Sequence, residues 1–438
     1  MIKKIYFLTL GCAKNEVDTS VMEGILQDHA YDIVDDPLEA DAIFVNTCGF
    51  IESAKEESID WILQLAKLKE EGQLQKLYLT GCLAQRYPEE LKREIPEIDG
   101  ILGPGYISRI ADYLDSGQDG FFTEEISTDY TEGKRKLPTG VTAYVKIAEG
   151  CNNRCSYCII PYLRGNNRSR KIEDIVEEVK DLVGQGTREV ILVAQNSTDY
   201  GIDLYGHYAL ADLLRELVKI QDLKWIRILY AYPDHFTEDL IDLMAKEEKI
   251  LPYLDMPLQH ASNKILRAMN RKSSRESLED LIGKLKARID HLVLRSTFIV
   301  GFPGEEEEDV QELLDFIEKI GFDRLGVFTY SREENTKAYT MEDQVSEEEK
   351  EKRFQKVMAA QRSISESRLK KQVGRVLDIL IEEKLDDGHY LGRSYLDIPE
   401  VDGQVYVEST SPLDIGGFYP VKIQETTDYD MEGVALWI

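Results

Sequence analysis

The sequence has few cysteines and no long apolar run. Its 438 residues include six cysteines, and no stretch approaches the roughly 18 consecutive apolar residues that a membrane span needs. The first residues read as a strand rather than as a secretion signal. Since disulfides belong to oxidising compartments, we expect reduced thiols in a cytoplasmic protein that is not bound to a membrane.

Basic residues are also scarce. There are 53 Lys and Arg against 82 Asp and Glu, so the net charge is −29. This excludes a generic nucleic-acid binder, whose affinity rests on basic residues facing phosphates, but not a local basic patch. A basic partner fits the charge better, and a solvated acidic surface is the simpler alternative. The hydrophobic share of 42% is enough for folded cores, and the length suggests about two to four domains.

The first 128 residues alternate short apolar runs with longer amphipathic ones. This pattern predicts a parallel sheet with helices on both faces. The expected strands are Ile5 to Leu10, Ala42 to Asn46 and Lys76 to Thr80, and the helix between the last two is Ser53 to Leu68. We therefore predict an amino-terminal α/β domain over residues 1–128, followed by a charged linker with Gly and Pro over 129–141.

A longer alternation of strands and helices occupies residues 142–345. Its expected strands are Ala143 to Ile147, Glu189 to Ala194, Trp225 to Tyr230, Tyr253 to Met256, Leu292 to Val300 and Arg324 to Thr329. Six such units are too few for a closed eight-stranded barrel, so an open, partial (β/α)6 barrel is predicted.

The last part of the chain changes pattern. Residues 346–372 form a charged helical stretch that connects to a tail of short strands with turns over 373–438. The tail predicts a small antiparallel β-barrel. The fold class is thus α/β, with a small all-β domain at the end.

Three cysteines form a compact motif just after the first strand of the central domain. Cys151, Cys155 and Cys158 are spaced Cys-x3-Cys-x2-Cys. Three thiolates in one loop can hold three irons of a [4Fe–4S] cluster and leave the fourth open to a substrate or cofactor. Zinc, or thiols without a ligand, is the alternative, but a structural zinc site needs four ligands and no fourth lies nearby.

The motif resembles that of the radical S-adenosylmethionine superfamily, in which the open iron binds S-adenosylmethionine. The resemblance implies that Tyr157 packs near adenine, although loop packing alone also accounts for an aromatic residue there. Other candidate cofactor contacts end strands of the same domain: Gln195 ends the second, Gln259 the fourth and Gly301 the fifth. His260 is equally consistent with a hydrogen-bonded core histidine.

The other three cysteines are far apart but share a context. Cys12, Cys48 and Cys82 each follow an apolar strand of the first domain. In a parallel sheet all three lie at the carboxyl edge, where such sheets bind ligands. They can converge on a second cluster with one open iron, or they can be separate buried thiols.

Short segments around all six cysteines resemble the methylthiotransferase family. The segments of the first domain are Thr9 to Asn15, Asn46 to Ile51 and Gly81 to Tyr87, and the loop segment runs from Cys151 to Arg170. The resemblance covers essentially the whole chain and implies two [4Fe–4S] clusters, S-adenosylmethionine as cofactor and a carboxyl-terminal TRAM barrel. It also implies an electron donor such as flavodoxin or ferredoxin.

Within this family, Gly-Cys-Ala-Lys-Asn at Cys12 resembles the branch that modifies small-subunit ribosomal protein twelve. The tail from Val373 to Ile438 supports this with 4 basic and 14 acidic residues, a net charge of −10. An RNA-binding module should be basic, whereas an acidic one suits a basic ribosomal protein. The simpler alternative is that the tail is acidic because the whole chain is. Nucleic acid is therefore not the expected direct substrate, and a transfer-RNA adenosine methylthiotransferase is the alternative. A non-enzymatic iron–sulfur electron carrier is the more distant one.

The resemblance implies methylthiolation of an aspartate β-carbon. That carbon is unactivated, so a radical must remove its hydrogen. The hypothesis assigns radical generation to the cluster at Cys151, Cys155 and Cys158. It assigns delivery of the methylthio group to the cluster at Cys12, Cys48 and Cys82. Both open irons must then face one cavity between the first two domains.

Overall fold

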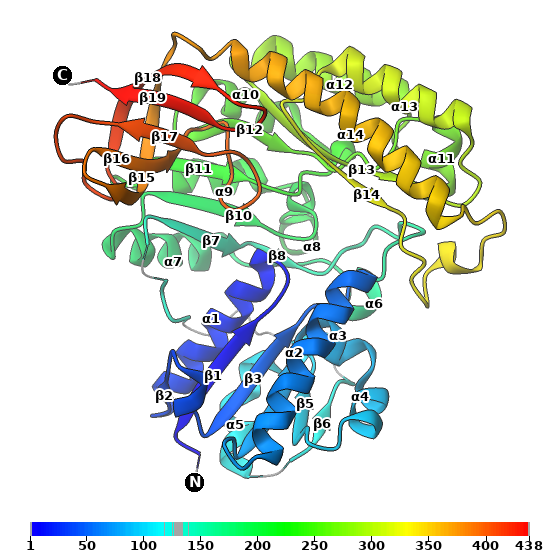
Figure 1. The fold of residues 1–438 in the computed structure, drawn as a ribbon, viewed down its shortest axis with the longest axis vertical. Helices are drawn as coiled ribbons and strands as arrows, with labels where there is room; N and C mark the ends of the chain where they lie inside the picture. The colour runs from blue at the N-terminus through cyan, green and yellow to red at the C-terminus, as the bar shows by residue number, and fades with distance from the viewer. Residues whose placement is uncertain (1, 118, 125, 127–134, 139, 437–438) are drawn as a thin grey trace.

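The computed structural model describes residues 2–117, 119–124, 126, 135–138 and 140–436. Figure 1 shows the amino-terminal domain, blue to cyan, below the larger central domain, with the small barrel in red beside the central sheet. Of the predicted linker 129–141, residues 129–134 and 139 lie outside the described residues. No helix in the described part of the chain has the length and apolar character that a membrane crossing requires.

The amino-terminal domain is a parallel sheet in the order β2-β1-β3-β4-β5-β6. Its strands are β1 Lys4–Thr9, β2 Asp32–Ile33, β3 Ala42–Thr47, β4 Lys76–Thr80, β5 Gly100–Leu102 and β6 Phe121–Phe122. Its helices are α1 Ala13–Asp28, α2 Glu52–Glu70, α3 Gly81–Arg86, α4 Pro88–Glu94 and α5 Ile110–Ser116. Side chains of β3 alternate: Ile43 and Val45 pack with α2 and α3, and Phe44 packs with α1 and α5. Both faces are therefore covered by helices, as predicted.

The central domain is a second parallel sheet, in the order β14-β13-β12-β11-β10-β7. Its strands are β7 Thr142–Lys146, β10 Glu189–Val193, β11 Trp225–Ile228, β12 Ile250–Asp255, β13 Val293–Val300 and β14 Arg324–Thr329. Its covering helices are α7 Ile172–Gly184, α8 Ile202–Tyr205, α9 Leu210–Leu217, α10 Glu238–Lys246, α11 Asn263–Ala268, α12 Arg275–Arg288 and α13 Glu307–Ile320. Within the described residues β7 and β14 are its two edges, which confirms the open, partial barrel.

A short insertion after β7 was not predicted. Strands β8 Ala148–Glu149 and β9 Arg168–Ser169 pair antiparallel, with α6 Ile160–Leu163 between them. The two-residue strands carry no periodicity that a sequence could reveal. The pair closes the base of the loop that carries Cys151.

Helix α14 Glu347–Lys370 leads into the closed carboxyl-terminal barrel. The barrel strands are β15 Val376–Asp386, β16 His389–Arg393, β17 Val405–Glu408, β18 Phe418–Thr426 and β19 Met431–Ala435. The pairs are antiparallel except β17 with β19, which run parallel. The prediction of a small barrel is confirmed, although β19 and its parallel pairing were not foreseen.

The barrel packs firmly on the central sheet. Val193, Trp225 and Tyr253 of that sheet share one apolar core with barrel residues. The buried Glu189 of β10 accepts hydrogen bonds from Arg227 at 2.9 Å and from barrel residue Arg393 at 2.7 Å. Apolar burial and this ion pair together hold the two domains in one arrangement.

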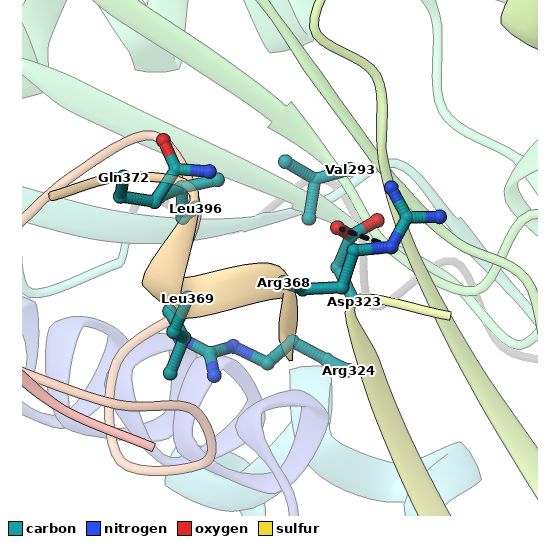
Figure 2. A pocket seen from close by; sticks show the side chains of 7 residues that line it. All are labelled: Val293, Asp323, Arg324, Arg368, Leu369, Gln372 and Leu396. Atoms are coloured by element: carbon teal, nitrogen blue, oxygen red, sulfur yellow. Dashed lines mark ion pairs between the residues drawn. The ribbon is translucent and has the colours of Figure 1, made fainter. Parts of the chain in front are cut away.

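A small pocket lies where α14 meets β13, β14 and the barrel (Figure 2). Arg368 of α14 and Asp323 face each other at its side, 3.9 Å apart. Its lining is Val293, Asp323, Arg324, Arg368, Leu369, Gln372 and Leu396. None of the six cysteines is among these residues, so the candidate chemistry lies elsewhere.

Candidate functional site

The cysteines of the first set lie at the carboxyl ends of three parallel strands. Cys12 precedes α1, Cys48 directly follows β3, and Cys82 is the second residue of α3, directly after β4. Strands β1, β3 and β4 are neighbours in the sheet. Their ends therefore bring the three thiols to one edge.

The backbone at this edge is packed tightly around the thiols. Gly11 has a φ of +95°, and a Cβ there would lie 2.7 Å from Cys48 Cβ and 3.0 Å from its Sγ. A Cβ on Gly49 would lie 2.7 Å from Leu83 Cα, next to Cys82. Burial, with smaller contributions from neighbouring Cys82 and Cys12, raises the pKa of the Cys48 thiol to about 11. The three thiols thus lie near enough to interact electrostatically.

Polar side chains beside the cysteines hold the strand ends. Asn15 Nδ2 donates to the carbonyls of Leu10 at 2.8 Å and Thr47 at 3.3 Å. Ser58 Oγ accepts from the Cys48 backbone N–H at 3.1 Å and donates to its carbonyl at 3.0 Å. Sequence reasoning assigned these two residues no role, although each is a buried polar residue on the helix that follows a cysteine, Asn15 after Cys12 and Ser58 after Cys48.

The second set occupies the loop between β8 and α6. Gly150 has a φ of +76°, and a Cβ there would lie 2.1 Å from the Asn166 carbonyl oxygen. The Cys151 N–H donates to the Gly165 carbonyl at 3.0 Å, and the Ser156 N–H to that of Met269 at 2.9 Å. These backbone hydrogen bonds hold Cys151 and Ser156 of the loop in place.

Burial also changes the acidity of this second set. It raises the pKa of the Cys151 thiol to about 11, and it raises the pKa of Cys158 well above its usual range. After burial, the neighbouring Cys155 contributes to the upward shift of both pKa values. Such protonated thiols must release their protons when they bind a metal centre.

The donor set of each group suits an iron–sulfur cluster. Within the described residues, no three His, Cys, Asp or Glu side chains are grouped so that they could hold one metal ion. A [4Fe–4S] cluster spreads its thiolates over separate irons, and so takes a wider donor set than one ion does. Neighbouring thiols, Cys82 buried and the others half-buried, with glycines where a Cβ would fill the space, fit such a group.

Two of the predicted cofactor contacts lie at the second set. Tyr157 packs against an apolar cluster that includes Met269 and Phe302, and burial raises the pKa of its hydroxyl well above the usual value. Gln195 Nε2 donates to Glu149, and the buried Gln195 Oε1 has no hydrogen-bond partner among the described residues. An unpaired buried acceptor is unusual and marks a place where a ligand can donate.

The two others lie at strand ends without a described contact to the cysteines. Gln259 has a left-handed φ of +74°, and its backbone continues the sheet, with its N–H donating to Thr297 at 2.8 Å. Gly301 has a φ of +75°, and the space beside it is filled by Lys350, whose Cγ would lie 2.3 Å from an added Cβ. Their roles toward a cofactor stay predictions.

His260 is a buried, hydrogen-bonded core histidine. Its Nδ1 accepts the Ser262 N–H at 2.9 Å, and its Nε2 lies 3.4 Å from Glu305 Oε2. Burial raises the pKa of Glu305, but its neighbours His260, the Gly301 N–H and Arg353 together lower it more, so that pKa lies below its usual value. The simpler of the two interpretations of His260 accounts for its contacts.

A buried charge network joins the first two domains between the cysteine sets. Lys146 of β7 pairs with Asp18 of α1 and donates to Glu149 at 2.9 Å. Arg164, 3% exposed, donates to Asp18 at 2.6 Å and to Glu149 at 3.1 Å. Its Nε also donates to Cys82 Sγ at 3.4 Å. Burial lowers the pKa of Arg164, but Cys82, Glu149 and Asp18 raise it more, so the guanidinium stays charged.

A second connection crosses the same interface. The buried Glu333, from the segment after β14, accepts from Arg86 at 2.7 Å and from Lys55 at 3.1 Å. The same segment reaches the second cysteine loop, where the Ala338 N–H donates to the Ser156 carbonyl at 2.8 Å. The sequence does not predict the contacts of Glu333, because Glu333 lies 247 residues from Arg86 and 278 residues from Lys55.

Family models match three parts of the chain. The model of the Radical SAM superfamily matches residues 145–317, that of the uncharacterized protein family UPF0004 matches 4–103, and that of the TRAM domain matches 373–436. Fold and site thus define a radical SAM protein flanked by these two domains.

Close relatives share almost the whole chain. "Ribosomal protein uS12 methylthiotransferase RimO" of Desulforamulus reducens is 51% identical over 437 residues, which cover 98% of each chain. The protein of the same name from Clostridioides difficile is 48% identical over 99% of each chain. The chain belongs to the ribosomal protein uS12 methylthiotransferase family, which confirms the predicted branch.

Solved structures share the fold at low identity. The radical S-adenosylmethionine methyltransferase TsrM from Kitasatospora setae has a TM-score of 0.57 and 16% identity, over 74% of this chain and 72% of that one. The cobalamin-dependent S-adenosylmethionine radical enzyme OxsB has a TM-score of 0.54 and 14% identity, over 82% of this chain and 56% of that one. At these identities the likeness extends to the fold alone.

Proposed function

We propose that this chain places a methylthio group on the β-carbon of an aspartate in small-subunit ribosomal protein uS12. The observation that carries the proposal is the meeting of two three-cysteine sets at one buried interface. Arg164, which follows the second set in sequence, contacts Cys82 of the first. The printed name of the relatives supports the choice of substrate.

The proposed cofactors are two [4Fe–4S] clusters and S-adenosylmethionine. Cys12, Cys48 and Cys82 would hold one cluster, and Cys151, Cys155 and Cys158 the other. Three thiolates leave one iron of each cluster without a protein ligand. When bound, the second cluster and S-adenosylmethionine supply the carbon radical that an unactivated C–H bond requires.

The chain itself binds, orients and excludes water. Tyr157 and Gln195 lie at the second set and are the proposed cofactor contacts, with Gln259 and Gly301 at strand ends of the same sheet. The four buried charges of the interface pair with one another. Between α1 and β7 these paired charges would exclude water from that side of the site and so shield a reactive group there from solvent.

The acidic barrel supports a basic protein substrate. Of the barrel's four basic residues, Arg393 is buried and pairs with Glu189. Glu383, Glu408 and Asp414 are exposed. Asp397 is buried as well, so the remaining residues of the barrel keep the acidic balance of the composition. Complementary charge favours encounter with a basic partner.

A substrate comparison tests this choice. The reconstituted enzyme is incubated under reducing conditions with ribosomal protein uS12 or with unmodified transfer RNA, and tandem mass spectrometry locates the product. We expect a methylthio group on one aspartate and none on RNA. A deletion strain that loses a 2-methylthio nucleoside but keeps its ribosomal protein unchanged would contradict the proposal.

Cleavage of S-adenosylmethionine consumes an electron. We assign its delivery to a small one-electron carrier such as flavodoxin or ferredoxin, in the cytoplasm where ribosomal proteins are made. Cleavage that requires the reduced carrier, and stops when it is omitted, would support this assignment. Cleavage by the protein alone would exclude it.

A further inference from the structure

Arg164 belongs to the central domain, but most of its side-chain partners belong to the first. Its backbone N–H donates to the Ile160 carbonyl at 2.8 Å, which places it at the end of α6, shortly after Cys158. Its side chain crosses the interface and is buried there. The residue is thus fixed to one cysteine set and directed at the other.

The planar guanidinium uses its donors on four separate groups. Nε donates to Cys82 Sγ at 3.4 Å, and one terminal nitrogen donates to Asn15 Oδ1 at 2.8 Å. The other terminal nitrogen donates to Asp18 and Glu149. Such a fixed fork of donors is a property of arginine that lysine lacks.

Through Asn15 the same guanidinium is linked to the backbone just before the other two cysteines of the first set. Asn15 Nδ2 donates to the carbonyls of Leu10 and Thr47, which lie just before Cys12 and Cys48. Arg164 holds the Oδ1 of this amide and so fixes its orientation. One side chain of the central domain is therefore linked to all three strand ends that carry the first set.

Arg164 is also linked to the backbone of its own cysteine loop. Glu149, its carboxylate partner, accepts the Gly150 N–H at 3.1 Å, directly before Cys151. The next residue after Arg164, Gly165, accepts the Cys151 N–H at 3.0 Å. A displacement of Arg164 would therefore disturb the backbone beside both cysteine sets.

We infer that Arg164 is a positioning residue that holds the two cysteine sets in register and, through its N–H···S bond to Cys82, raises the reduction potential of the cluster at the first set. Hydrogen bonds to the sulfurs and the net charge nearby are the levers that tune such potentials. A donor and a positive charge at a ligand sulfur both favour the state that carries the extra electron. This inference rests on the proposed function, since it takes the first set to hold a cluster.

The first test measures the potential of that cluster. The full-length chain with Cys151, Cys155 and Cys158 replaced by alanine is reconstituted without oxygen, so that iron binds at the first set only. A redox titration followed by electron paramagnetic resonance then compares Arg164, Arg164→Lys and Arg164→Met in this background. We expect a shift to more negative potential in Arg164→Met and a smaller one in Arg164→Lys.

Arg168→Met is the matched control. Arg168 lies in the same segment, but its side chain donates to the backbone carbonyls of Arg164, Asn166 and Ile126 and not to a cysteine. Its removal takes away one positive charge and should leave the potential nearly unchanged. An Arg164→Met potential equal to that of the unsubstituted background, or a shift of the same size in Arg168→Met, would overturn the inference.

The second test uses the iron-free protein, so it gives a result even where a variant binds no cluster. Hydrogen exchange followed by mass spectrometry compares wild type with Arg164→Met and Arg168→Met. We expect faster exchange in Arg164→Met at residues 10–19, 46–49 and 146–151, and no change in the control. Unchanged exchange at these segments in Arg164→Met would overturn the positioning role.

The two tests separate this inference from the proposed function. If the unsubstituted background binds no cluster at the first set, the proposed function fails, and the exchange experiment still decides whether Arg164 joins the two sets. If the cluster forms and its reduction potential does not change when Arg164 is replaced, the inference fails and the proposed function stands.

Discussion

Lys14 Nζ lies 3.6 Å from the centroid of the Tyr230 ring, across the boundary between the first two domains. Lys14 is two residues from Cys12, and Tyr230 follows β11 of the central sheet with a left-handed φ of +58°. A bulky residue in that conformation is strained and persists only when its surroundings require it. The contact therefore indicates a built interface at the first cysteine set rather than a chance approach of two domains.

A double-mutant cycle tests this contact. We expect Lys14→Met and Tyr230→Leu to be coupled by about 0.5–2 kcal/mol, as for a partly desolvated cation over an aromatic face. The measurement is urea unfolding of the iron-free wild type, the two single variants and the double variant. Additive single effects would show that the contact does not persist in solution.

Gly11→Ala should abolish the first cluster and spare the second. The added Cβ meets Cys48, and the left-handed φ alone costs about 1–3 kcal/mol for a residue other than glycine. Iron content after reconstitution should fall from about eight to about four per chain, the content of one [4Fe–4S] cluster.

Gly72→Ala is the control for backbone strain. Gly72 has a φ of +75° and nothing within 4 Å of an added Cβ. This variant should keep the full iron content at a modest loss of stability. If Gly11→Ala also keeps the full iron content, the prediction that this variant abolishes a cluster at the first set is wrong.

The sequence was sufficient for the class of the two parallel sheets and for the placement of the cysteines, but not for the short strands β2, β5, β6, β8 and β9. Apolar runs that end in Cys12, Cys48 and Cys82 predict strand ends at one sheet edge, because parallel strands all point the same way. The buried network was not predictable, because Lys146 and Asp18 meet across 128 residues of sequence. Gly301 stays a predicted cofactor contact, and the side chain that fills the space beside it is Lys350 of α14.

Glu333→Gln should weaken the second interface connection in a pH-dependent way. Burial raises the pKa of Glu333, but Ser331, Arg86 and Lys55 lower it more, so the net shift is downward from 4.5. Removing the charge leaves Arg86 without this carboxylate partner and Lys55 with Glu52 alone. It should cost about 3–5 kcal/mol at neutral pH.

The sign of the pH effect follows from this lowered pKa. The ionised carboxylate stabilises the fold above pH 4.5, and that stabilisation is lost as the pH falls through the lower folded value. Thermal unfolding of wild type and variant should therefore differ most at neutral pH and converge in acid. A difference that is constant with pH would show that the carboxylate charge is not what stabilises this connection.

Neutralising acidic residues of the barrel should weaken substrate binding. We expect the double variant Glu408→Gln and Asp414→Asn to raise KM for the ribosomal protein several-fold at low salt, with kcat unchanged, and the effect should shrink at high salt. The double variant Glu70→Gln and Glu71→Gln, at the far end of the first domain's α2, is the control and should leave KM unchanged. An equal increase of KM in both double variants would show that only the overall charge of the protein matters, not the position of the charges on the barrel.

The central claim is that the two cysteine sets have different roles, cofactor cleavage at Cys151, Cys155 and Cys158 and delivery of the methylthio group at Cys12, Cys48 and Cys82. Its most direct measurement is mass spectrometry of ribosomal protein uS12 and of S-adenosylmethionine products after reaction with wild type and with the triple alanine variant of Cys12, Cys48 and Cys82. Wild type should form 5′-deoxyadenosine and a methylthio-aspartate. The triple variant should still cleave the cofactor and form no methylthio product. A triple variant that methylthiolates its substrate would contradict the account.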